Sequence, residues 1–99
     1  MIYEIAQIEI KPGAELAFEA AVAQAAPHFQ AAKGCLSLAL ERGVETPSSY
    51  RLIVGWETVE DHMVTFRESE NFQVWRALAS PHFAAPPQVV HVSRVLNAF

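Results

Sequence analysis

The segments predicted to form strands carry apolar side chains on both faces. Residues 2–10 read IYEIAQIEI, with isoleucine at even and odd positions alike. Residues 50–57 place Leu52 and Trp56 on one face and Ile53 on the other. An antiparallel sheet with one solvated face alternates apolar and polar residues more cleanly than this. The pattern therefore predicts a sheet that is covered on both faces.

Length and composition determine what can cover the second face. Ninety-nine residues is the size of one domain, and we expect a single domain over residues 1–99. Its own helices can cover only one face of a sheet. Apolar residues make up 52% of the chain against 18% that are charged. This surplus of apolar residues predicts a homodimer in which a second copy covers the other face.

The order of the predicted elements gives the fold class. Apolar and β-branched runs predict strands at 2–10, 35–44, 50–57 and 89–96, and helix-favouring residues predict helices at 14–32, 59–67 and 70–79. Pro27 is expected to kink the first helix or end it early, and Thr58 is expected to cap the second. This is the ferredoxin-like β-α-β-β-α-β arrangement of the α+β class, with an antiparallel four-stranded sheet. Two such sheets packed face to face would form a dimeric α+β barrel.

Charge and cysteine content exclude several classes of partner. The net charge is −4 and the seven basic residues are scattered, so we expect no binding to nucleic acid or to an anionic membrane surface. No apolar run is long enough to span a bilayer, and the opening residues lack the basic region of a signal peptide. The lone Cys35 is expected to be a buried structural thiol and is typical of a cytoplasmic protein. The four histidines lie far apart, which disfavours a metal site.

His62 is the best single candidate for acid–base chemistry. It lies in the first turns of the predicted helix 59–67, on the same face as Phe66, and this face should look onto the sheet near Trp56. A neutral imidazole with a lowered pKa in an apolar pocket could take a proton from a phenolic substrate. The alternative is a partly buried histidine that bonds to the backbone, and this is the commoner role.

Aromatic residues are concentrated in one third of the chain. They indicate either core packing or the walls of a flat, apolar cavity for an aromatic ligand, and they are Trp56, Phe66, Phe72 and Trp75. Arg51 and Arg76 could orient an anionic or quinone oxygen, although an exposed salt bridge is the commoner use of either. His82 lies in a proline-rich loop, residues 80–87. That loop could close over one end of a cavity or simply connect rigidly to the last strand.

Several short motifs, taken in order, resemble the antibiotic biosynthesis monooxygenase (ABM) domain family. The resemblance covers most of the chain, from the opening IYEIAQIEIKPG onward, and its carriers are Gly34-Cys35, Tyr50-Arg51, Trp56-Glu57, His62, Phe66, Phe72 and Trp75. It implies the dimeric α+β barrel. It also implies an enzyme that oxidises electron-rich phenols and quinols with molecular oxygen and without metal, flavin or haem, so that the substrate itself donates the electrons.

The resemblance also implies roles for particular residues. Trp56 and a nearby base, His62, would carry the catalysis. With the aromatic and loop residues named above, the expected substrate-binding set is Tyr50, Arg51, Phe66, Phe72, Trp75 and His82. A haem-degrading branch of the family carries an asparagine, a tryptophan and a histidine ligand at positions held here by Ala6, Phe66 and Arg76. The ligand is missing, so we expect no haem degradation, and the resemblance to the cofactor-free members implies no other cofactor.

Three functions remain open from the sequence. The first is a cofactor-independent monooxygenase that acts on a quinol or polyphenol. The second is a non-catalytic binder or carrier of a small aromatic metabolite, and the third is a dimeric interaction module with no small-molecule site. A cavity between the sheet and the helices would favour the first two functions. Filling of that space by Trp56, Phe66 and Trp75 would favour the third.

Overall fold

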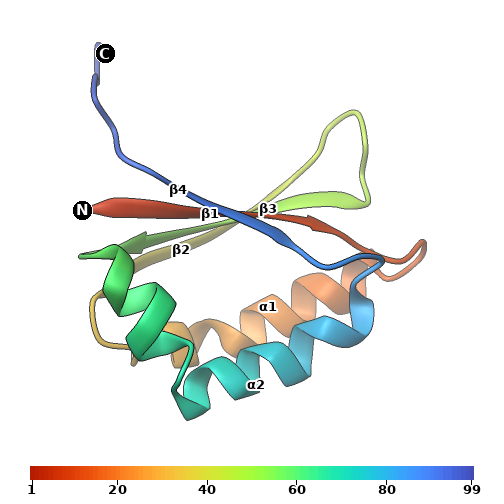
Figure 1. The fold of residues 1–99 in the computed structure, drawn as a ribbon. Coiled ribbons are helices and arrows are strands. Elements are labelled where there is room, and N and C mark those ends of the chain that lie inside the picture. Colours follow the sequence, from red (N-terminus) through yellow and green to blue (C-terminus); the bar gives the residue numbers. More distant parts are fainter.

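A four-stranded antiparallel sheet forms one layer of the protein, and helices form the other (Figure 1). The computed structural model describes residues 1–99. The strands are β1 (Ile2–Glu9), β2 (Cys35–Arg42), β3 (Ser49–Trp56) and β4 (Gln88–Val92), in the spatial order β2-β3-β1-β4. The main helices are α1 (Glu15–Gln30) and α2 (Glu70–Ala79), and both cover the same face of the sheet. The predicted ferredoxin-like α+β fold is confirmed.

The core lies between the sheet and α1. One side of β1 and β3 is buried there, including Ile8, Leu52 and Val54. The facing side of α1 buries a stripe at helical spacing: Phe18, Ala21, Val22, Ala25 and Phe29. The helix runs past Pro27 to Gln30, so the expected early end does not occur. The missing N–H of a proline removes one helical hydrogen bond, but packing of Phe29 in the core holds the last turn in place.

The second helical element begins as predicted but continues as a π-helix, η1 (Asp61–Phe66). The hydroxyl of Thr58 accepts a hydrogen bond from the backbone N–H of Asp61 at 3.0 Å, as expected of a cap. At the other end, the N–H of Arg67 donates to the carbonyl of His62, five residues back, at 3.3 Å. π-turns often occur at functional sites. Here the turn carries three buried residues, Asp61, His62 and Phe66.

Gly34 fixes the position of η1 relative to the sheet. Its φ is +77°, and a Cβ at this position would collide with the carboxylate of Asp61. Its carbonyl accepts a hydrogen bond from the N–H of Glu57 at 2.8 Å, just beyond the end of β3. Only glycine combines this backbone conformation with so close an approach. The first turn of η1 is thereby held against the end of β3.

Two strands are shorter than predicted. The strand predicted at 89–96 ends at Val92, which pairs with Tyr3 near the start of β1. Beyond this point β1 offers almost no further backbone to pair with, so the remaining residues leave the sheet. The strand predicted at 35–44 ends at Arg42, because the N–H of Gly43 turns to the carbonyl of Ser49 and closes the hairpin.

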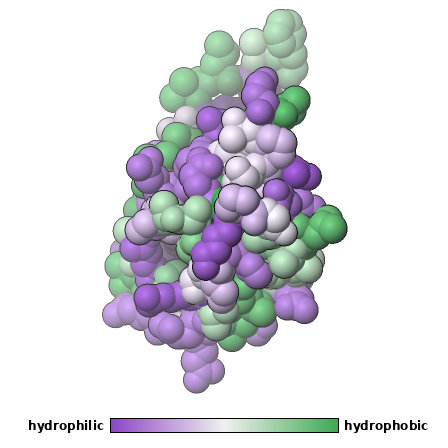
Figure 2. Space-filling model, turned by 90° about the vertical axis from the view of Figure 1, so that its right-hand side faces the viewer, coloured by the Kyte–Doolittle hydropathy of each residue, from purple (hydrophilic) through white to green (hydrophobic).

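The face of the sheet away from the helices is apolar along its centre, and only residues 93–96 of the chain lie against part of it. It presents Tyr3, Ile5, Ala39, Ile53, Val90 and Val92, here called the open face. Val90 is 56% exposed and Val92 is 46% exposed. The C-terminal segment, residues 93–99, projects past this face (Figure 1), and hydrophobic residues dominate the part that stands above the body in Figure 2. No helix has the length and apolar character needed to cross a membrane.

Candidate active site

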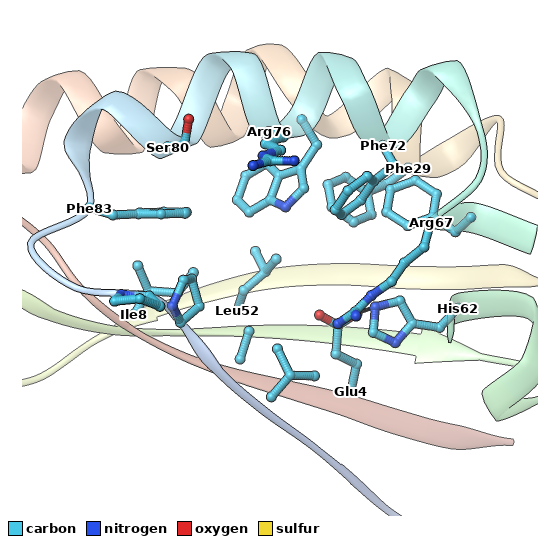
Figure 3. Close-up of a pocket in the computed structure, with 16 residues that line it drawn as sticks. Glu4, Ile8, Phe29, Leu52, His62, Arg67, Phe72, Arg76, Ser80 and Phe83 are labelled. Atoms are coloured by element: carbon cyan, nitrogen blue, oxygen red, sulfur yellow. Dashed lines mark ion pairs between the residues drawn. The ribbon is translucent and has the colours of Figure 1, made fainter. Parts of the chain in front are cut away.

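A pocket of about 380 Å³ separates the sheet from α2 (Figure 3). Its floor comes from β1, β3 and β4, its helix side from α1, η1 and α2, and one end from the loop after α2. The lining residues are Glu4, Ala6, Ile8, Phe29, Leu52, His62, Phe66, Arg67, Phe72, Trp75, Arg76, Ser80, Phe83, Pro86, Pro87 and Val89. A cavity of about 150 Å³ lined by apolar side chains is enough for a benzene ring. The space between sheet and helices is therefore open, and large enough for a mono- or bicyclic aromatic molecule.

A buried carboxyl group stands at one end of the pocket, on β1. Glu4 is only 5% exposed. Its Oε1 accepts a hydrogen bond from the indole nitrogen of Trp56 at 3.1 Å and lies 3.2 Å from Nε2 of His62. The imidazole and the indole are stacked, with centroids 5.3 Å apart and planes 16° from parallel. The carboxyl is thus held on one oxygen by two rings that are themselves packed together.

The second carboxyl oxygen of Glu4 is the one that is open to the pocket. Both polar contacts of the Glu4 carboxyl are made by Oε1, and Oε2 accepts no hydrogen bond. Every fully buried side-chain oxygen or nitrogen in the protein does have a partner, so Oε2 is not one of the fully buried atoms. Oε2 is therefore accessible, and the residue lines the pocket. Figure 3 shows the Glu4 side chain rising from the sheet beside His62 with its oxygen toward the cavity.

A second histidine, His91 on β4, completes the cluster. Its Nε2 lies 2.8 Å from Nδ1 of His62, in a hydrogen bond between the two rings. His91 faces Glu4 directly across the pairing of β1 with β4. His91 is half-buried, whereas His62 is 3% exposed. A continuous line of polar atoms therefore runs from Glu4 through His62 to the partly exposed edge strand.

Burial sets the ionisation of this cluster. Desolvation raises the pKa of Glu4 to about 7, although the Trp56 hydrogen bond and the charge of Arg67 both lower it. Desolvation also lowers the pKa of His62 to about 4, with further lowering by His91 and Arg67. Because His62 is neutral at neutral pH, its contact with Glu4 is one between an uncharged imidazole and a carboxyl, and not an ion pair. At neutral pH the carboxyl can both hold and release a proton.

Two arginines bring positive charge to the pocket. Arg67 follows η1, and Figure 3 shows its side chain reaching toward Glu4 and His62. Arg76 comes from α2 and lies on the helix side of the cavity. The only ion pair in the structure joins Arg42 to Glu19, and the only other close contact between a basic side chain and a carboxyl is that of neutral His62 with Glu4. Neither lining arginine therefore has a carboxylate partner.

The structure brings some of the expected site residues together and leaves others apart. His62, Phe66, Phe72 and Trp75 line the pocket. Trp56 and His82 do not line the pocket. Trp56 is connected to it through its hydrogen bond to Glu4, and His82 lies between two lining residues, Ser80 and Phe83. Tyr50 is buried elsewhere, with its hydroxyl donating to Glu19 at 2.7 Å, and Arg51 donates to Gln7 at 3.2 Å. Neither Tyr50 nor Arg51 reaches this pocket.

The sequence analysis did not identify two residues of the cluster, Glu4 and His91, as candidate site residues. Only for Glu4 did the sequence contain a clue. Glu4 has the same parity in its strand as Ala6 and Ile8, which marks a carboxyl on the core side of the sheet. His91 had no comparable signal, because its pairing with His62 depends on how β4 aligns with β1. Cys35 is half-buried and not buried as expected, because it begins β2 at the edge of the sheet, and desolvation raises the pKa of its thiol. No group of three or more His, Cys, Asp or Glu side chains is arranged to hold a metal ion.

The sequence profile of the family described as "Antibiotic biosynthesis monooxygenase" matches residues 1–78. The chain belongs to the ABM family. It is 40% identical over 95 residues, 96% of this chain and the whole of the relative, to the uncharacterized protein YczJ of Bacillus subtilis (strain 168). The chain is 55% identical in sequence to a protein of Bordetella bronchiseptica whose crystal structure is provisionally described as an antibiotic biosynthesis monooxygenase. The two structures superpose with a TM-score of 0.95 over 96% of this chain and 97% of that one.

The ABM fold also relates this chain to SnoaB, a cofactor-independent oxygenase from Streptomyces nogalater. A mutant form of SnoaB superposes with a TM-score of 0.82 over 98% of this chain and 95% of SnoaB, at 15% identity. At that identity the likeness concerns the fold alone.

Proposed function

We propose that this ABM-family protein is a cofactor-independent monooxygenase that oxidises a small phenol or quinol with molecular oxygen. The observation that carries the proposal is the Glu4 carboxyl, which opens onto an aromatic-walled pocket and has a pKa raised to about 7. A general base is most effective when its pKa lies near the operating pH. The family membership and the shared fold of a cofactor-independent oxygenase support the same reading.

The contacts within the cluster favour Glu4 over His62 as the base that meets the substrate. Both ring nitrogens of His62 already have partners, His91 on one side and Glu4 on the other. Oε2 of Glu4 has none. His62 then acts together with Trp56 to hold the carboxyl in place, and it offers a route for the proton toward His91. The imidazole remains part of the acid–base machinery, one step removed from the substrate.

The reaction follows from deprotonation of a bound aromatic alcohol. Oε2 of Glu4 takes the proton of the substrate hydroxyl, and the charge of Arg67 stabilises the phenolate that remains. The phenolate is electron-rich enough to reduce molecular oxygen. One oxygen atom enters the ring and the other leaves as water, so that 1,4-dihydroxybenzene and O2 would give hydroxy-1,4-benzoquinone and water. All electrons come from the substrate, and Glu4 returns its proton to the oxygen that becomes water.

The walls of the pocket suit such a substrate. Phe66, Phe72 and Trp75 surround the space beside Glu4, and Phe66 meets Phe72 edge to face with centroids 5.6 Å apart. Aromatic walls favour a flat ring by offset or edge-on contact. They also exclude water from the reacting oxygen species, which limits side reactions.

The oxygenase would act as a homodimer joined through the open face. That face carries exposed Val90 and Val92 at its edge and runs into a groove formed with residues 93–96. Val95 in this segment is 94% exposed. Contiguous exposed apolar surface of this kind is rare on a protein that functions as a monomer. The pocket lies on the opposite side of the sheet, so both sites of the dimer stay accessible. The lone Cys35 fits a cytoplasmic location.

A non-catalytic carrier of a small aromatic metabolite would use the same pocket, and one experiment separates the two functions. The protein is incubated with a set of dihydroxyarenes under ¹⁸O2, and oxygen uptake and product mass are followed. The oxygenase predicts uptake above the uncatalysed rate and one labelled oxygen atom in the product. It also predicts that Glu4→Gln lowers the rate by about a hundredfold or more, the usual contribution of a general base. Thermal stabilisation by these compounds without any turnover would instead identify a carrier.

A further inference from the structure

The charge around the pocket does not match a neutral quinol. The chain as a whole has a net charge of −4. Yet the charged side chains that line the pocket are two arginines, Arg67 and Arg76, and one glutamate whose pKa of about 7 leaves it only partly ionised. The acidic residues next to them in sequence, Glu68 and Glu70, are exposed and do not line the cavity. The pocket is thus a local site of positive charge on an acidic protein.

Arg67 and Arg76 lie at different places in the pocket. Arg67 reaches toward the Glu4–His62 end, where its charge acts on both of their pKa values. Arg76 lies on α2, on the helix side of the cavity and away from the Glu4 carboxyl (Figure 3). It makes no ion pair and no side-chain hydrogen bond within the chain. A planar guanidinium with free donors is the residue type best suited to bind a carboxylate.

We propose that the pocket binds a hydroxylated aromatic acid, with the ring between the aromatic walls, the hydroxyl toward Glu4 and the carboxylate on Arg76. This rests on the proposed function, because it uses the same pocket and the same base. It adds the class of substrate: an arene that carries both a phenolic hydroxyl and a carboxylate. The volume of about 380 Å³ leaves room for the second substituent beyond one ring.

The test compares 2,5-dihydroxybenzoate with its methyl ester, two ligands that differ in charge but little in shape. Binding is measured by titration calorimetry without oxygen, so that no turnover intervenes. Arg76→Gln removes the proposed carboxylate partner, and Lys33→Gln removes one positive charge from an exposed site outside the pocket. We expect the wild type to bind the acid about fivefold to tenfold more tightly than the ester, as an ion pair near a protein surface allows.

Arg76→Gln should remove this preference, because its affinity for the acid should fall while its affinity for the ester stays within about twofold of the wild-type value. Lys33→Gln should keep the preference. The preference should also shrink as salt is raised, because the ion pair lies near solvent. Equal affinity of the wild type for acid and ester, or an equal loss of both ligands in Arg76→Gln, would overturn the inference. Absence of binding by either ligand would overturn it too. Tight binding of the acid with no oxygen uptake would leave this inference standing and would contradict the monooxygenase.

Discussion

The indole N–H of Trp56 donates a hydrogen bond to Oε1 of Glu4 at 3.1 Å, entirely within the protein. Trp56 is fully buried, and Glu4 stands between it and the pocket. A hydrogen bond to the charged form of a carboxyl lowers its pKa. Trp56 therefore offsets part of the desolvation that raises the pKa of Glu4 to about 7. Trp56, which was expected in the catalytic group, does not line the pocket, and its polar contact there is with Glu4.

Replacing this indole should move the pH dependence of activity. Trp56→Phe keeps a buried ring but removes the N–H, so the pKa of Glu4 should rise by about one unit, the worth of a hydrogen bond to a charged group. The pH at which oxygen uptake is half-maximal should rise by the same amount. Trp75→Phe is the matched control, because it makes the same change in the pocket wall without touching Glu4. An unchanged midpoint in Trp56→Phe would show that the bond does not tune the base.

The raised pKa of Glu4 also predicts how stability depends on pH. Between its ordinary pKa of 4.5 and about 7, the folded protein holds the Glu4 proton more tightly than the unfolded chain does. The contribution of Glu4 to stability therefore falls as pH rises through this window. Glu4→Gln has no such proton to lose. As pH rises between these limits, the unfolding free energy of Glu4→Gln minus that of the wild type should increase by up to about 3 kcal/mol.

Urea unfolding at several pH values across this window measures the difference. His62, whose lowered pKa changes stability in the opposite direction with pH, is present in both proteins and largely cancels. A difference between variant and wild type that stays constant from acid to neutral pH would mean that the carboxyl titrates normally in the folded state.

The bond between the two histidines should matter for both stability and turnover. His91→Leu leaves Nδ1 of His62 buried without its partner, which should cost about 1–3 kcal/mol of unfolding free energy. Loss of the outward route for the proton should also slow oxygen uptake. His91→Gln places an amide nitrogen near the position of Nε2 and should restore much of both. Equal behaviour of the leucine and glutamine variants would indicate that His91 contributes only packing.

A glycine can be required by its backbone conformation or by a close approach of neighbouring atoms, and substitutions at Gly34 and Gly13 distinguish the two. Both have positive φ, +77° and +83°, but an added Cβ meets Asp61 only at Gly34, and meets nothing within 4 Å at Gly13. Gly13→Ala should cost about 1–2 kcal/mol, the cost of the backbone conformation alone. Gly34→Ala should cost more and should also reduce activity, because displacement of Asp61 moves the adjacent His62. Similar losses of stability in chemical unfolding would argue that Asp61 simply swings aside.

The homodimer can be tested by placing a charge on the open face. Val92→Lys puts an ammonium group at the edge of that face, whereas Val44→Lys changes an 88% exposed residue in the hairpin loop. Light scattering should show a dimer for the wild type and for Val44→Lys. Val92→Lys should be monomeric and should melt at a lower temperature, because the apolar face is then left in water. A dimer of normal stability in Val92→Lys would place the interface elsewhere.

The fold was well predicted from the sequence because apolar residues recur with the periods of strands and helices. Apolar runs and turn residues placed every strand, and the apolar residues on both faces of the strands predicted that the sheet has a second apolar face, away from its own helices. The strand ends were less certain: β4 stops at Val92 for lack of a partner in β1, which no local pattern encodes. The π-helical form of η1 was likewise invisible, since its residues would suit an ordinary helix.

The site was predicted only in part, for a different reason. His62, Phe66, Phe72 and Trp75 share helical faces and so could be grouped from the sequence. Glu4 and His91 come from distant strands and meet His62 only through the register of three chain segments. A carboxyl on the core side of a strand was the available clue. Its significance depends on the neighbours that desolvate it, and these are set by the tertiary structure.

The pH profile of kcat/KM for oxygen uptake tests whether Glu4 is the base of a cofactor-independent oxygenation. With a substrate whose own hydroxyl titrates well above neutrality, the wild-type profile should rise about tenfold per pH unit and level off above pH about 7. Glu4→Gln should lack this rise and remain at least about a hundredfold slower on the plateau. A Glu4→Gln variant that keeps the wild-type rate and midpoint would show that Glu4 is not the base.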